Sequence, residues 1–406
     1  MSFYQLQAPT EWVEPPTAWS STTLDEVEAC PRRWQLLRSR WGEHERFPLR
    51  PSPAAIEGQI VHDALDKLTR ACGQRGNPAF GSAEFAAAAA DAGFFGGIPL
   101  SVIDWQKRLE AHPRPGPAFR LRATPEDLTN RAVRMFREQY KSEGGAARRA
   151  VERETTAPVD VKSLLLSKRV LSEVQLKHPT LPFLGILDRV QIASDGVEVV
   201  DFKTGKPTEK HRRQLLRYAL LWWRTTHDVP VRISAQYLDG VASWPVALGE
   251  LTKVEAELGR KMRHLTDTLL ARPAAAKPGA GCHACPVRAR CADGWDLGEE
   301  AAIADGRGDA ELVVTAKAGE HGFLGRSRAG VEIAVVYEAA LEKLVPDHGD
   351  GQVLRVLDGV WKEKRSQLEI KAWTEVFVVA AATLRWLRRF ANARDPTDFS
   401  TCIRGR

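Results

Sequence analysis

The sequence predicts an α/β fold, and three consecutive stretches of the chain predict it. Strands are expected at Leu184–Ile192 and Val197–Lys203, joined by a turn whose Asp-Gly pair suits a hairpin loop with positive φ. An amphipathic helix is expected next, at 210–225, followed by a further strand at Val231–Leu238. A hairpin followed by a helix and a strand is typical of an α/β core.

The end of this hairpin carries two carboxylates and one ammonium group. Asp188 lies on the first strand; Asp201 and Lys203, on the second, point to the same face because side chains alternate along a strand. Converging charges on an apolar hairpin are costly unless they pair or bind a metal. The carboxylate oxygens suit Mg²⁺, and the lysine would lie beside the attacked phosphate. The alternative interpretation is a solvated Asp201–Lys203 pair, with Asp188 capping a turn.

Composition and charge limit the number of domains and the kinds of partner expected for this chain. The chain has 406 residues, enough for two or three domains, and its 43% apolar and 27% charged residues allow a sizeable core. A net charge of +6 permits a nucleic-acid partner without demonstrating one. The N-terminal stretch lacks a secretory signal pattern, and the apolar run 376–384 is too short to span a membrane. We therefore expect a cytoplasmic protein without a membrane partner, whose six cysteines are reduced or bind metal.

Two helices are expected before the hairpin. The first begins near Ser20, where hydroxyl side chains can cap it, and continues through Cys30 toward Trp41. The second begins near Ile56 and has an apolar stripe, with His62 at the edge of that stripe. Taken alone, His62 is read as an ordinary histidine at the core boundary.

Between these helices and the hairpin, residues 72–150 read as a helical insertion with no visible chemistry. Strand-like segments are expected at Glu152–Val161 and Leu171–Leu176. On the helix that follows the hairpin, Gln214 and Tyr218 are four residues apart and therefore share one face.

A loop beginning at residue 271 delivers three closely spaced cysteines. Cys282, Cys285 and Cys291 have the spacing C-x₂-C-x₅-C, which indicates a metal site in a cytosolic protein. A tetrahedral site needs a fourth ligand, which could be the distant Cys30; ligation by His283 is awkward because it lies between two cysteines. Thiolate ligation suits either an iron–sulfur cluster or zinc.

The C-terminal residues 306–406 are expected to form a separate, small β-rich domain. Strands are expected at Glu311–Ala316, Val331–Tyr337, Gln352–Leu357 and Leu368–Ala372, and a helix at Glu375–Ala391. Barrels of this size can bind single-stranded nucleic acid, with Gly322–Arg326 and Trp361–Arg365 as candidate contacts. Because acidic residues are interspersed, a solvated hairpin with ordinary charges is the alternative.

Six motifs occur together in a fixed order: S-x₈-C-P, GQIVH, GILDRV, VVDFKTGK, QLLRY and C-x₂-C-x₅-C. In this order they resemble the RecB-like branch of the PD-(D/E)XK nucleases. More narrowly, the chain is similar to its iron–sulfur members, such as the AddB-type and CRISPR-adaptation nucleases. The resemblance covers residues 20–292. It implies a nuclease domain at 1–300 with a restriction-endonuclease-like core, in which a mixed central sheet is flanked by helices.

The resemblance also implies residue roles. His62, Asp188 and Asp201 would bind the metal, together with the carbonyl of Phe202. Lys203 would orient the attacking water. The pair that supports the active site from one helix would be Gln214 and Tyr218. The four ligands of a [4Fe-4S] cluster would be Cys30, Cys282, Cys285 and Cys291.

The implied activity is a Mg²⁺- or Mn²⁺-dependent deoxyribonuclease, expected to be an exonuclease on single-stranded ends that serves DNA repair, recombination or antiviral defence. The alternative function is an inactive nuclease fold that binds DNA or serves as a structural subunit of a helicase–nuclease complex. Zinc is the alternative to the cluster. No G-x₄-G-K-[ST] motif is present, so unwinding would need a helicase in trans.

Overall fold

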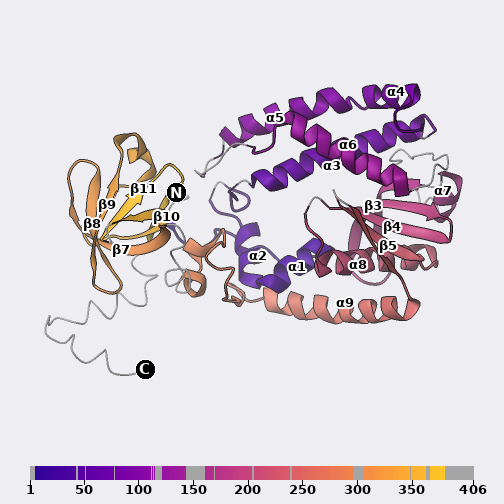
Figure 1. Cartoon of the computed structure of the whole chain (residues 1–406). Helices are drawn as coiled ribbons and strands as arrows, with labels where there is room; N and C mark the ends of the chain where they lie inside the picture. The colour runs from indigo at the N-terminus through magenta and orange to yellow at the C-terminus, as the bar shows by residue number, and fades with distance from the viewer. Residues whose placement is uncertain are drawn as a thin grey trace.

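A computed structural model provides the structure of the protein. The residues it describes are 5–42, 44–50, 52–76, 78–110, 112, 114, 121–142, 161–168, 170–203, 205–237, 240–295, 306–347, 349–362 and 366–379. Figure 1 shows a sheet between helices at one end of the molecule and a second, all-β unit at the other.

A five-stranded mixed sheet forms the centre of the first unit. Its strand order is β2-β3-β4-β5-β6, where β4 and β5 run parallel and the other neighbours are antiparallel. The strands are β2 (Val170–Lys177), β3 (Leu184–Ala193), β4 (Gly196–Phe202), β5 (Arg232–Tyr237) and β6 (Gly240–Pro245). The predicted hairpin is confirmed as β3 and β4; strand β6 was not predicted.

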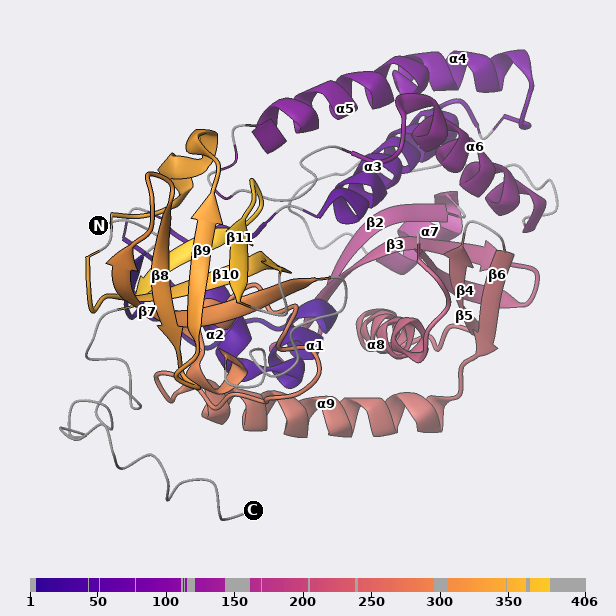
Figure 2. The same cartoon turned by 60° about the vertical axis from the view of Figure 1, so that its left-hand side comes forward.

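Helices cover both faces of this sheet (Figure 2). Helix α8 (Glu209–Thr226) makes the crossover between the parallel strands β4 and β5, and it buries its apolar side chains in the main core. Helix α9 (Leu248–Leu269) packs outside α8 and contributes to the same core. Its first half is mostly polar and exposed.

The N-terminal helix was predicted as one continuous element, and this prediction is wrong. The structure has α1 (Ser21–Ala29) and α2 (Pro31–Arg38), separated at Cys30, whose φ of −165° is extended. Pro31 causes the break, because a proline inside a helix removes one hydrogen bond and clashes with the preceding turn, whereas it fits the first position of a new helix.

A layer of helices covers the other side of the sheet (Figures 1 and 2), and three of these helices lie within the expected insertion 72–150. Its helices share a core of their own. They are α3 (Pro53–Gln74), α4 (Ala83–Asp91), α5 (Phe94–Glu110) and α6 (Pro125–Ser142). The strand expected at Glu152–Val161 lies outside the described residues except for Val161, which begins helix α7 (Val161–Lys168).

One helical stretch corrects the expectation that no segment could span a membrane. Ala83–Glu110 is long and apolar enough to cross one, by length and composition. Core helices of soluble proteins pass the same test but are mostly buried, whereas 22% of this apolar window is buried. In this stretch, Gly93 with φ +58° separates α4 from α5, and Phe94, Ile98 and Leu109 are buried in the insertion core.

The second unit is a seven-stranded sheet closed into a barrel by pairing between β10 and β7. Its strands are β1 (Gln5–Leu6), β7 (Arg307–Lys317), β8 (Gly322–Ser327), β9 (Glu332–Tyr337), β10 (Val353–Lys362), β11 (Gln367–Ile370) and β12 (Glu375–Val379). Strand β8 was not predicted. The helix expected at Glu375–Ala391 is wrong over its first five residues, where β-branched side chains form β12; residues 380–391 lie outside the described chain.

The two units are joined by buried ion pairs. The guanidinium of Arg114, in the segment after α5, contacts Glu375 of β12 at 2.7 and 2.8 Å, and both side chains are buried. Arg50, just before α3, lies 2.7 Å from the same carboxylate and 2.5 Å from Asp358 of β10. The start of α3 is therefore fixed against the barrel.

Candidate active site

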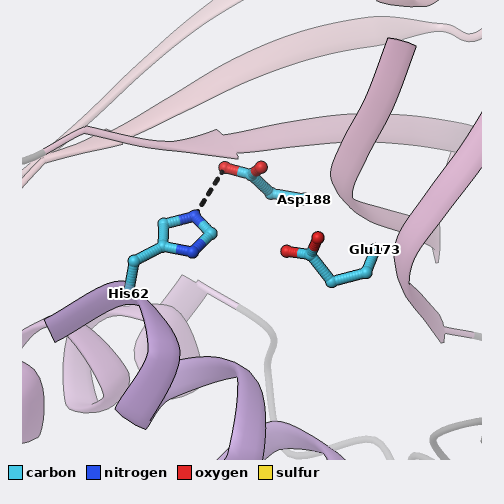
Figure 3. A group of neighbouring side chains, drawn as sticks. All are labelled: His62, Glu173 and Asp188. Carbon is cyan, nitrogen blue, oxygen red and sulfur yellow. Dashed lines mark ion pairs between the residues drawn. The ribbon is translucent and has the colours of Figure 1, made fainter. Parts of the chain in front are cut away.

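Three potential metal ligands meet where helix α3 approaches the sheet. His62 comes from α3, Glu173 from β2 and Asp188 from β3, and one ligand atom of each lies within 4.8 Å of the other two (Figure 3). His62 Nε2 is 3.3 Å from Asp188 Oδ2. Imidazole and carboxylate groups at this spacing form a set that suits Mn²⁺ or Mg²⁺.

Glu173 was not among the predicted site residues. It lies opposite Asp188, between the paired residues Ser172↔Arg189 and Val174↔Leu187, and its φ is +53°. This left-handed conformation is uncommon for a residue with a Cβ atom and often occurs at functional sites. In the sequence, the only indication of a role for Glu173 is that an acidic residue lies within a β-strand. Its position opposite Asp188 is set by the pairing of β2 with β3.

The other predicted residues form a chain of contacts beside this group. Lys203 Nζ lies 2.5 Å from Asp201 Oδ2 and donates a hydrogen bond of 3.0 Å to Gln214 Oε1. Gln214 Nε2 in turn donates to the Tyr218 hydroxyl at 2.7 Å. Because α8 holds both Gln214 and Tyr218, the helix fixes the position of the lysine ammonium group.

Phe202 connects the two sets. Its backbone N–H donates to Asp188 Oδ2 at 2.8 Å, and its ring packs edge-on against the His62 ring with centroids 6.2 Å apart. The metal-binding role of the Phe202 carbonyl stays a prediction. Together these contacts place His62 and Asp188 next to the end of β4, which Lys203 directly follows in the chain.

The site has an excess of negative charge. Burial, and then the negative charge of Asp188, raise the pKa of Asp201 to about 7, although Lys203 opposes this shift. The hydrogen bond to Asp188 raises the pKa of His62 despite partial burial. The Asp201 side chain is 2% exposed, and Oδ2 receives no well-directed hydrogen bond from the described residues, since its contact with Lys203 is an ion pair. A bound cation would relieve this charge.

A cavity of about 630 Å³ opens directly on the group. His62, Glu173 and Phe202 line it, together with the exposed side of α3 from Ala54 to Arg70. His62 and Glu173 are therefore accessible to a substrate of nucleotide size.

The cysteine-bearing segments also come together. Gln35 of α2, which is fully buried, hydrogen-bonds the backbone at Leu269, Ala271 and Ala274, so α2 is fixed to the loop after α9. This contact brings Cys30, at the start of α2, near that loop. Cys30 and Cys291 both lie close enough to Cys285 to raise its pKa, after the larger effect of burial. 

The sulfur atoms of Cys282 and Cys291 both lie near Gly294. A Cβ atom placed on Gly294 would lie 3.5 Å from Cys291 Sγ and 3.7 Å from Cys282 Sγ. Backbone N–H groups point at three of the four sulfurs: Gly279 to Cys282, Val287 to Cys285 and Gly294 to Cys291. Such donors stabilise thiolate charge. His283 is exposed.

A comparison with protein-family models matches residues 18–292 to the PD-(D/E)XK nuclease superfamily. This match covers both the candidate metal ligands and the cysteine motif. The chain belongs to the PD-(D/E)XK nuclease superfamily. Its mixed α/β core agrees with that fold, and nucleases of this superfamily generally use divalent metals and act on DNA.

Two further comparisons add little to this assignment. No curated protein matches the chain significantly. One similar solved structure is the crystal structure of SSO0001, with 18% sequence identity, covering 34% of this chain and 67% of that chain, at a TM-score of 0.21. A likeness at this TM-score carries no argument about function.

Proposed function

We propose that this superfamily member is a Mg²⁺- or Mn²⁺-dependent deoxyribonuclease that acts as an exonuclease on single-stranded ends. One observation carries the proposal. Two of the three grouped candidate ligands, His62 and Glu173, line a cavity. The third, Asp188, accepts a hydrogen bond from Phe202 N–H, between Asp201 and Lys203 in the chain. A cation site next to a positioned ammonium group is what phosphodiester hydrolysis requires.

The metal would be held by His62, Glu173 and Asp188, with Asp201 as a further carboxylate ligand. Bound Mg²⁺ supplies charge stabilisation for the phosphate and makes a water molecule easier to deprotonate. Asp201 keeps an oxygen without a directed hydrogen bond, which fits a ligand role. His62 must lose its proton to ligate a metal, which breaks its present ion pair with Asp188.

Lys203 performs the protein's part of the chemistry. Its ammonium group can donate a hydrogen bond to the attacking water and offset the negative charge that develops on the phosphate. Gln214 holds this group through its Oε1 atom, and Tyr218 holds the Gln214 amide. Preorganisation of this kind lowers the reorganisation needed during the reaction.

The four cysteines are proposed to bind a [4Fe-4S] cluster, which would place the chain in the RecB-like iron–sulfur branch. Four thiolates are the usual ligand set of a [4Fe-4S] cluster, and zinc can bind the same set. Cys282→Ser is expected to remove the visible absorption and to lower thermal stability, whereas bound zinc would give a colourless protein.

The decisive experiment is cleavage of 5′- and 3′-labelled single- and double-stranded DNA with Mg²⁺ or Mn²⁺, using protein purified without oxygen. Asp201→Ala is the matched inactive variant. Metal-dependent cutting that the variant lacks would support the nuclease, and the labelled ends would give its polarity. No cutting by the folded protein, alone or with a helicase supplied in trans, would contradict it and favour an inactive subunit.

A further inference from the structure

Strands β7 to β11 have the connectivity of an OB-type barrel. β7, β8 and β9 form an antiparallel meander; β9 pairs in parallel with β11; β11 pairs with β10, and β10 closes on β7. A short helical segment, η2 (Ala339–Leu344), connects the third strand to the fourth. Barrels of this type commonly bind single-stranded nucleic acid.

One end of this barrel combines positive charge with an indole ring. Arg307, at the start of β7, pairs with Val360, and its guanidinium lies 4.9 Å from the ring centroid of Trp373. The exposed Lys362 lies two residues after Val360 on β10, whereas Trp361 between them packs against the barrel core. We call Arg307, Lys362 and Trp373 the basic–aromatic rim. An arginine plane and an indole ring can stack with bases, and both cations can contact phosphates.

The opposite end of the barrel is acidic. A cavity of about 310 Å³ there is lined by four acidic residues, Glu320, Glu342, Asp347 and Asp350, together with Lys317 at the far end of β7. A phosphate backbone is repelled from this end. The charge distribution therefore directs a nucleic acid to the basic–aromatic rim.

The rim lies on the side of the barrel that faces the nuclease centre. Arg50 donates a hydrogen bond of 3.0 Å to the carbonyl of Trp373 and pairs with Asp358. Helix α3 is capped by Ser52 and carries His62 ten residues later, a distance of about 15 Å along the helix axis. The cavity of the candidate active site begins at Ala54, so a few nucleotides could connect the two places.

We propose that the basic–aromatic rim is a second binding site for single-stranded DNA, which holds the strand whose scissile bond lies at the nuclease centre. The inference rests on the proposed function and adds a substrate-holding surface outside the catalytic residues. It selects single strands because stacking requires unpaired bases. It also keeps the cleaved strand attached after each cut.

The test uses two charge reversals on the same strand. Arg307→Glu changes the rim, and Lys317→Glu makes the same change at the acidic end of β7. Both side chains are exposed, so both proteins should fold. Binding of fluorescent single-stranded DNA of about 20 nucleotides, longer than the ~4–16 that one barrel covers, is measured by anisotropy in EDTA, where no cleavage occurs. A duplex of equal length is measured in parallel.

Arg307→Glu is expected to weaken single-strand binding about tenfold or more and to reduce the salt dependence by roughly 0.7 in log–log slope, the contribution of one phosphate contact. Lys317→Glu should bind within about twofold of the wild type. Equal binding by both variants, or equal weakening for the duplex, would overturn the inference. These outcomes are separate from the nuclease test: a wild type that cuts nothing, yet loses binding on Arg307→Glu, contradicts only the proposed activity.

Discussion

At the scale of single residues, three positions carry most of the proposed chemistry: Lys203, Asp201 and Glu173. Lys203 is held by Asp201 and Gln214, so its ammonium group has a fixed place. Asp201 is buried and has a strongly raised pKa, whereas Glu173 has a strained backbone beside His62. Each of these features has a measurable consequence.

Lys203→Ala should lower DNA cleavage by about 10²–10⁴-fold, the usual contribution of a positioned proton donor or acceptor. The fold and most of the DNA affinity should remain, because the alanine leaves the metal ligands in place. Lys206→Ala, an exposed lysine three residues away, is the control and should cut normally. Single-turnover cleavage rates measure both; normal cutting by Lys203→Ala would exclude the assigned role.

The raised pKa of Asp201 predicts a pH-dependent stability in the absence of metal. Its folded pKa of about 7 lies above its ordinary value of 3.8. This contribution to stability is therefore fully present below pH 3.8 and is lost as the pH rises through 7. In EDTA, the free energy of unfolding of the wild type, measured with denaturant, should therefore fall relative to that of Asp201→Asn as the pH rises over this range. Added Mg²⁺ should reverse the order at pH 8, because only the carboxylate binds the ion well. Parallel curves in EDTA would contradict the assignment.

Glu173→Gln should weaken Mn²⁺ binding roughly 10-fold or more, because it removes one charge from the ligand group. Gln175→Ala, an exposed residue two positions further along β2, is the control and should bind the metal as the wild type does. Calorimetric titration of Mn²⁺ into both proteins measures the difference. Unchanged affinity in Glu173→Gln would place this residue outside the metal site.

At the scale of secondary-structure elements, the contact between β3 and α8 positions the lysine. Gly185 on β3 faces α8, and a Cβ atom there would lie 2.9 Å from both Tyr218 Cε1 and Leu221 Cδ1. The missing side chain lets the helix approach the sheet closely. Tyr218 then holds Gln214, which holds Lys203.

Gly185→Ala should destabilise the protein by about 1–3 kcal/mol, the usual cost of overpacking. It should also slow cleavage, because α8 carries Gln214 and must shift. Gly249→Ala is the matched control: it lies in α9, no atom would lie within 4 Å of its Cβ, and it should raise stability by up to about 1 kcal/mol. Denaturant unfolding and cleavage rates test both, and equal effects of the two variants would refute the close-packing argument.

At the scale of the whole molecule, buried charges join the insertion, the start of α3 and the barrel. Arg114 also donates to the Pro48 carbonyl at 2.7 Å, so one guanidinium ties the two units together. Arg290 lies over the rings of Trp41 and Phe377 at the same junction, and burial lowers its pKa to about 9. The junction therefore holds the barrel in a fixed position relative to the nuclease centre.

Glu375→Ala should lower the free energy of unfolding by about 3–5 kcal/mol, because it leaves the buried Arg114 without its carboxylate. Asp104→Ala removes an exposed pair with Arg108 and should change stability by less than about 1 kcal/mol. Denaturant titration compares the two variants. A small effect of Glu375→Ala would show that the barrel is only loosely attached.

Much of the candidate site could be predicted from short stretches of sequence. Asp188, Asp201 and Lys203 stand out because charges interrupt an apolar hairpin, and helical spacing places Gln214 with Tyr218. Two features that the sequence did not predict share a physical cause. Glu173 and strand β12 were missed because neither contrasts with its neighbours in sequence, and pairing with distant strands defines both.

The sequence by itself determined the hairpin, the helical insertion and the cysteine spacing, because each follows from alternation, helical periodicity or the interval between like residues. Only the tertiary structure decided that Glu173 joins His62 and Asp188, that Cys30 approaches the other cysteines, and that the barrel turns its basic–aromatic rim toward α3. These relations depend on contacts between segments far apart in the chain, where burial of charge and strand register, not local preference, set the lowest free energy.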